Sequence, residues 1–197
     1  AKTKVLEVLE SLADTDTLNI NGLHVSKYNS YQLVITDATS LVKVASSTPD
    51  TPVDPEEPDT PVDPEEPEQP LSSSIKDVYS KTVGDKVTVE GVITGIYGNN
   101  FYINDGVKGI LVYLGNETKY ASLVKLGANV VVEGSVDIYK DIHQIKTITS
   151  LNASNKTYNA TSIKLTKVSQ DELKKYPNDL VNLEGVSVSD LGTYESG

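Results

Sequence analysis

Apolar and polar residues alternate along the middle of the chain with the period of two that is typical of β-strands. Between Lys86 and Ile96, one face of such a strand collects Val87, Val89, Gly91 and Ile93. The opposite face carries Thr88, Glu90, Val92 and Thr94. This alternation predicts a strand with one buried face, and Gly91 in its middle predicts a bulge or tight bend.

Turn residues divide the region that follows into four more strands and one helix. Strands are expected over 101–104, 109–114, 129–136 and 142–148. The spacing of Tyr120, Leu123 and Val124 predicts a helix over 116–125. Three strands, a helix and two strands is the order of the OB-fold, a five-stranded Greek-key barrel with a helix between strands three and four. The expected class is therefore all-β, with short helices.

Both ends of the chain repeat parts of this central unit. Asn21-Gly22 precedes Glu133-Gly134 by 112 positions, and Glu90-Gly91-Val92 returns 94 positions later as Glu184-Gly185-Val186. The N-terminal echo predicts a helix over 3–13 and strands over 18–25 and 31–44. The C-terminal echo predicts a short helix over 171–176 and a strand over 181–188. Such repeats indicate a window from a longer tandem array.

The repeats also predict the domain organisation. We expect the C-terminal half of an OB-like unit over 1–47, an acidic proline-rich linker over 48–70, a complete OB-fold domain over 71–155, and the N-terminal part of a further unit over 156–197. Half-barrels expose unpaired strand edges, so the partial units should pack on each other, on the central domain or on a neighbouring molecule. Together they still lack strands two and three, so a closed composite barrel is not expected.

Charge and proline are concentrated in the linker. The formal net charge is −11, but nine of the 28 acidic residues lie between Thr48 and Pro70, which leaves 19 acidic and 17 basic residues elsewhere. Eight of the nine prolines lie in the same segment, which predicts an extended solvated spacer. All 17 basic residues are lysines, and the lack of arginine argues against strong or specific nucleic-acid recognition.

The central motifs resemble a known family. They are Gly84-Asp-Lys-Val-Thr-Val-Glu-Gly-Val-Ile-Thr-Gly95, Asn99-Asn-Phe-Tyr-Ile-Asn-Asp105 and Gly109-Ile-Leu-Val-Tyr-Leu-Gly115. The pattern resembles OB-fold accessory domains of secreted bacterial nucleases, 5′-nucleotidases and related phosphoesterases, mostly from Gram-positive bacteria. The resemblance implies a non-catalytic binding module, extracellular or on the cell surface, beside a catalytic domain outside this chain.

Residues suited to catalysis are few. The chain has no cysteine, which excludes thiol catalysis and thiolate metal sites. Its two histidines are His24 and His143, and at the offset of 112 positions Tyr31 takes the place of His143, as at a packing position. No metal-binding, P-loop or hydrolase motif is present. We therefore expect no catalytic residue, no metal site and no cofactor.

Residues suited to binding follow from the parity of the strands. If Phe101 and Ile103 fill the barrel, Tyr102 and Asn104 face outward, and by the same argument Tyr113 faces outward from the next strand. Tyr102 and Tyr113 would then form an aromatic platform on the face where OB-folds bind oligonucleotides or oligosaccharides. The candidate ligand-binding residues are Tyr102, Tyr113, Tyr97, Tyr139, Asn104, Lys108 and Lys140, with the two lysines as phosphate contacts.

Two functions remain open at this point. In the first, the domain weakly binds single-stranded nucleic acid or an oligosaccharide. In the second, the units form a structural spacer or stalk without a ligand, and the tyrosines merely cover the barrel. The incomplete end units add the possibility of self-association. No apolar run approaches the roughly 18 to 20 residues that span a bilayer, so no membrane insertion is expected.

Overall fold

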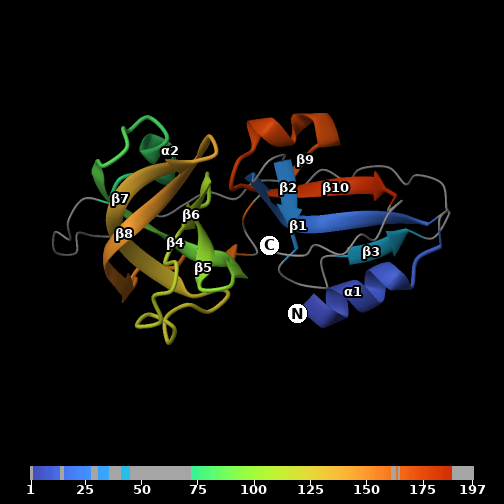
Figure 1. Ribbon diagram of the computed structural model, residues 1–197, viewed down its shortest axis with the longest axis horizontal. Helices are drawn as coiled ribbons and strands as arrows, with labels where there is room; N and C mark the ends of the chain where they lie inside the picture. Colours follow the sequence, from blue (N-terminus) through green and yellow to red (C-terminus); the bar gives the residue numbers. More distant parts are fainter. Residues whose placement is uncertain are drawn as a thin grey trace, which may run out of the picture.

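The protein is described by a computed structural model that covers residues 2–13, 16–27, 31–35, 41–44, 72–160, 163 and 165–187. These residues form a β-rich molecule in which a closed barrel lies beside a second sheet (Figure 1). The linker expected over 48–70 lies outside the described residues. The barrel comes from the middle of the chain, and the second sheet from both ends.

The barrel is built from five consecutive strands. They are β4 (Lys86–Tyr97), β5 (Asn100–Asn104), β6 (Gly109–Val112), β7 (Asn129–Tyr139) and β8 (Ile142–Ala153). Their order around the barrel is β4-β5-β6-β8-β7, and antiparallel pairing of β4 with β7 closes it. β6 and β8 pair in parallel, whereas the other neighbours are antiparallel. A short helix, α2 (Ile75–Val78), precedes the barrel, and the Ser74 side chain caps it by accepting a hydrogen bond from the Asp77 amide.

The barrel core collects the inward residues of every strand. Its buried members include Val87, Val89, Ile93, Phe101, Ile103, Ile110, Val112, Val130, Val132, Val136 and Ile145. The parity predicted for 101–104 and 109–114 is therefore confirmed. The prediction that β4 has only one buried face is wrong, because Val92 and Glu90 are buried as well. Glu90 is paired with Lys156, 3.0 Å from its ammonium group, beyond the end of β8.

The helix expected over 116–125 is not formed. The segment consists of turns, in which most backbone hydrogen bonds join residues two or three apart, and only the Val124 amide reaches back four positions, to Tyr120. Tyr120, Leu123 and Val124 nevertheless pack on the barrel core, as their spacing predicted. A segment this short has little helical stability of its own, so packing of its apolar residues decides its path.

Gly91 is not the site of a bulge. Pairing of β4 with β7 is continuous through Gly91, and the irregularity in β4 lies between Ile93 and Gly95, opposite β5. Gly91 is required for a different reason. A Cβ atom there would lie 2.6 Å from the backbone oxygen of Asn104, so β5 can cross this closely only over glycine.

Substitution of Gly91 by alanine should therefore destabilise the barrel. Forcing a methyl group against backbone costs about 1–3 kcal/mol in a packed core. Urea denaturation followed by circular dichroism measures the free energy of unfolding. Gly98→Ala is the control, since a Cβ atom at Gly98 would meet nothing within 4 Å and only the positive φ of 60° opposes the change. A loss no larger than that of the control would contradict the close approach.

The second sheet joins the two ends of the chain. Its strands are β1 (Thr17–Lys27), β2 (Tyr31–Val34), β3 (Leu41–Val44), β9 (Thr166–Lys167) and β10 (Leu180–Val186). The order is β2-β1-β10-β9, and β3 also pairs with β1. Helix α1 (Lys2–Glu10) packs its apolar residues on this sheet, and the 3₁₀ helix η3 (Gln170–Lys175) contributes Leu173 to the same core. Among the described residues this sheet does not close into a barrel.

The second sheet reproduces part of the barrel. At the offset of 112 positions, β1 corresponds to β7, and at the offset of 94, β10 corresponds to the first part of β4. Ile20 pairs with Leu183 in the second sheet, as Val132 pairs with Val89 in the barrel. The pairs on either side of this one, Leu18 with Val186 and Leu23 with Val181, are displaced by one residue from the barrel register.

The conformation of Gly22 is one difference between β1 and β7. Gly22 has a φ of 70°, and the register of β1 against β10 shifts between Ile20 and Leu23. Before the shift Leu18 and Ile20 point into the core of the second sheet, whereas after it Leu23 and Val25 do. A bulge of this kind re-aims the side chains that follow. It turns His24, which lies between Leu23 and Val25, away from its own core.

Candidate functional site

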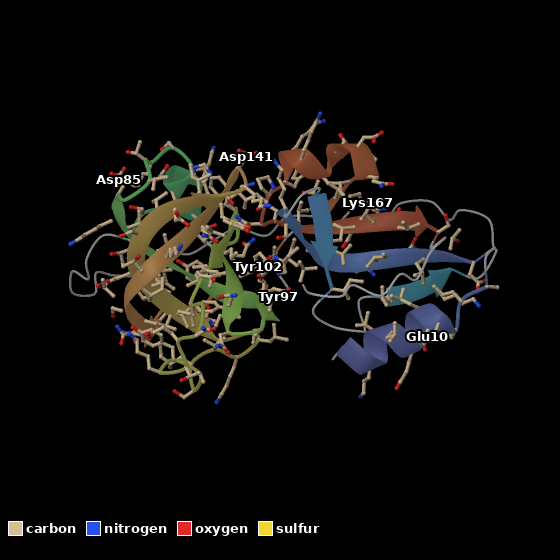
Figure 2. All side chains as sticks on the ribbon, in the orientation of Figure 1. Glu10, Asp85, Tyr97, Tyr102, Asp141 and Lys167 are labelled. Carbon is tan, nitrogen blue, oxygen red and sulfur yellow. The ribbon has the colours of Figure 1, made fainter. Side chains whose placement is uncertain are left out.

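The side chain of His24 lies on the outer face of the barrel. Its ring stacks on the ring of Tyr102, with the centroids 4.0 Å apart and the planes within 8°. Only 1% of His24 and 2% of Tyr102 remain exposed. Figure 2 shows Tyr102 at the junction between the barrel and the second sheet, with Tyr97 and Asp141 at opposite margins of that junction.

Tyr102 is therefore not an exposed platform residue. Its side chain leaves the barrel on the predicted side, because Phe101 and Ile103 fill the core and Tyr102 does not belong to that cluster. The prediction of exposure is wrong because β1 covers this face. Burial raises the pKa of the Tyr102 hydroxyl, which is hydrogen-bonded to the Ser26 side chain. The face where a stacked ligand was expected carries a ring of the chain itself.

A turn before β10 holds the junction together; we call residues 176–179 the docking turn. At its centre, Asn178 is buried and adopts a φ of 64°. Its side-chain amide donates to the His143 carbonyl at 2.7 Å and to the Tyr79 hydroxyl at 3.0 Å. Its backbone amide donates to the Val25 carbonyl at 2.8 Å, and its carbonyl accepts from His24 Nδ1 at 3.2 Å. Asn178 thus bonds to the barrel and to β1 at once.

Asp179 adds a charged contact to the docking turn. One carboxylate oxygen pairs with the Lys108 ammonium group, and the other accepts a hydrogen bond from the Gly109 amide at 2.8 Å. Lys108 is predicted as a phosphate contact; in the structure its ammonium group is paired with Asp179, and a role toward a ligand stays a prediction. Gly109 also has no space for a side chain, since a Cβ atom would lie 2.4 Å from the Asn178 carbonyl oxygen.

Tyr79 completes the contact from the barrel side. Its hydroxyl lies 2.7 Å from the Gly109 carbonyl and 3.1 Å from the Pro177 carbonyl. Its ring packs on His143 at 5.0 Å, which is the half-buried packing role expected for that histidine. Burial raises the pKa of the Tyr79 hydroxyl strongly, so it stays protonated and donates.

The junction keeps His24 neutral. Burial lowers the pKa of its imidazole to about 4, and the backbone groups of Thr94 and Asn178 act weakly in the opposite direction. Nδ1 has the Asn178 carbonyl as its acceptor, but Nε2 is buried without a hydrogen-bond partner among the described atoms. A second proton on the ring would therefore be placed in a buried position, where the backbone groups of Thr94 and Asn178 offset only part of the cost of desolvation.

The remaining candidate residues divide into buried and exposed ones. Asn104 was expected to face solvent, but it is buried and its side-chain oxygen accepts a hydrogen bond from the Gly106 amide at 2.7 Å. Tyr97 is 64% exposed, Tyr113 39% and Tyr139 49%. The ammonium group of Lys140 lies 5.9 Å from the centre of the Tyr139 ring.

Two of the exposed tyrosines lie in one row across the barrel. Tyr97 pairs with Asn100, and Tyr113 follows the residue of β6 that pairs with Phe101 and also with β8. The next position of β8 is Lys146, whose ammonium group lies 5.5 Å from the centre of the Tyr113 ring. Tyr97, Tyr113 and Lys146 therefore share an outer row that the second sheet leaves accessible.

The histidines and acidic side chains of the described residues do not gather at one place. Within them, no three His, Asp or Glu side chains come together as potential metal ligands. His24 is engaged with Tyr102, and His143 with Tyr79. The described part of the chain also has no helix with the length and apolar character needed to cross a membrane.

The molecule is thus defined as a β-rich protein in which a five-stranded barrel is docked on a second sheet. No protein-family model and no curated protein sequence matches the chain. Among solved structures, the hypothetical protein ygiW from E. coli is similar at 18% identity, over 43% of this chain and 90% of that protein, with a TM-score of 0.37.

Proposed function

We propose that this chain is a non-catalytic accessory region of an extracellular bacterial protein, and that its barrel serves as a rigid spacer. In this proposal the barrel is an OB-fold, which its strand order and its closure between β4 and β7 support. The acidic, proline-rich linker and the resemblance to accessory domains of secreted phosphoesterases support the extracellular setting. The parent protein's catalytic domain would lie outside this chain.

The observation that carries the spacer role is the stack of His24 on Tyr102. OB-folds bind ligands on the face of strands two and three, which corresponds to β5 and β6. Here the tyrosine at the centre of that face is covered by a ring from β1, and Lys108 is paired with Asp179. A face used in this way fixes one unit against the next.

A second candidate function is weak binding of a polymer along the outer row. It is favoured by the exposure of Tyr97 and Tyr113 and by the position of Lys146 above the Tyr113 ring. Stacking on an aromatic side chain contributes about 1–3 kcal/mol per base and does not select sequence. Single-stranded nucleic acid and oligosaccharide both offer rings for such a row.

One titration separates the two functions. Labelled single-stranded DNA and a labelled oligosaccharide are each titrated at low salt against the intact protein, the Tyr97→Ala/Tyr113→Ala variant and the Tyr139→Ala control. We expect no binding up to about 100 μM, the weak end of ordinary non-specific affinity. Binding that is lost in the double variant and kept in the control would overturn the spacer role and establish the outer row as the site.

A further inference from the structure

The outer edge of β2 stands at one end of the second sheet. In the order β2-β1-β10-β9, β2 pairs with β1 on one side and with no other strand of the described residues. Residues 31–34 therefore offer backbone amides and carbonyls on their outer side. Such an edge is a template for pairing with an added strand.

The barrel contains the corresponding edge with its partner in place. The offset of 112 positions places Gln32 and Leu33 of β2 on Gln144 and Ile145 of β8. In the barrel these two residues of β8 pair in parallel with Leu111 and Val112 of β6. One chain thus holds two copies of the same edge, one covered by β6 and one without a partner in the described sheet.

Apolar residues beside the outer edge of β2 are less covered than their counterpart in the barrel. Leu33 is only half-buried, whereas Ile145, at the offset of 112 positions, is fully buried in the barrel core. Ile35, just after β2, is half-buried as well.

We propose that the outer edge of β2 forms an acceptor site for a β-hairpin patterned like β5–β6. The hairpin would carry apolar residues on the face turned to the sheet, as Phe101, Ile103, Ile110 and Val112 do in the barrel. Its second strand would run parallel to β2, as β6 runs parallel to β8, and its first strand would pair with the second. The site is distinct from the His24–Tyr102 junction and does not depend on the spacer role.

The test uses the chain's own hairpin as the probe. A fluorescent peptide of residues 97–115 is titrated into the intact protein, and anisotropy reports binding. A matched peptide with Ile103→Lys and Ile110→Lys is the control, because it keeps the turn and destroys the apolar face. We expect saturable binding of the first peptide and affinity at least about tenfold lower for the second.

Hydrogen exchange locates the bound peptide. We expect slower exchange of the amides of β2, with the barrel strands unchanged. A Leu33→Lys variant of the protein, altered at a half-buried position, should lose binding while its circular dichroism is kept. The proposal is overturned if no binding saturates by about 100 μM, if both peptides bind alike, or if protection appears instead in β4 and β8, because the peptide has then replaced the barrel's own hairpin.

Discussion

Acidification from pH 7 to pH 4.5 should weaken the docking of the barrel on the second sheet by about 2–3 kcal/mol through His24 alone. Burial lowers the pKa of His24 from 6.5 to about 4 in the docked state. A base with a lowered pKa contributes its full stability above pH 6.5 and loses it as the pH falls toward 4. Each unit of difference corresponds to about 1.36 kcal/mol.

The measurement needs a variant that does not titrate. His24→Phe keeps a ring on Tyr102 but cannot accept a proton, so its stability should lack this component. Urea denaturation of both proteins between pH 7 and 4.5 gives the difference directly, and the comparison cancels other acid-sensitive groups. Those groups include His143 and the carboxylates of Asp16, Asp85, Asp141 and Glu172, whose pKa values are all lowered.

An NMR titration checks the same prediction by following the His24 imidazole directly. The imidazole signals of His24 should remain those of the neutral ring down to about pH 5, because its pKa is held near 4 by burial. A pKa near 6.5 would mean that His24 is exposed to water and that the stack on Tyr102 does not persist in solution.

Removal of the Asn178 side chain should have the second large effect. Asn178→Gly preserves the φ of 64° without strain and deletes the bonds to Tyr79 and His143. The Tyr79 hydroxyl keeps its bonds to the Gly109 and Pro177 carbonyls, so that lost bond costs about 0.5–1.5 kcal/mol, whereas the loss of the donor to the His143 carbonyl costs about 1–3 kcal/mol. The total loss should reach about 2–4 kcal/mol. Hydrogen exchange should show the amides of the docking turn opening, while the barrel strands stay protected.

Two further variants make the interpretation specific. Gly109→Ala disrupts the same contact from the barrel side, because its Cβ would meet the Asn178 carbonyl. The loss of stability in the double variant should therefore be smaller than the sum of the two single losses. Asp141→Asn is the control, because it removes only the exposed ion pair with Lys27 at the margin of the junction and should change little. Equal losses in the control and in Asn178→Gly would show that no single contact holds the docking turn.

The strands of the barrel could be predicted because their cause is local. Each strand shows its apolar alternation within a few neighbouring positions, as at Val87 and Val89 or at Phe101 and Ile103. All four side chains are buried in the barrel core. The turn segment after β6 was mispredicted as helix because its apolar spacing suits both a helix and a packed turn. The same period appears in α1, where a regular helix does form.

The junction could not be predicted, because its cause is distant in the sequence. Parity placed Tyr102 outside the barrel correctly, but nothing near it indicates that His24 covers it. Asp179 corresponds to Asp85 at the offset of 94 positions. The Asp85 carboxylate accepts a hydrogen bond from the Thr82 amide, whereas the Asp179 carboxylate pairs with Lys108. The signal that could have helped is Pro177-Asn178, a turn dipeptide placed just before a predicted strand.

The conformation of Gly22 decides which way the residues after it face. Gly22 and Gly134 are the same residue at equivalent positions, but only Gly22 has a positive φ. Gly134 keeps β7 in phase, so the equivalent of His24 in the barrel, Val136, points into the core. Two strands with the same glycine can therefore present different side chains to their surroundings: one backbone rotation turns a position that packs inside its own sheet into one that contacts a neighbouring domain.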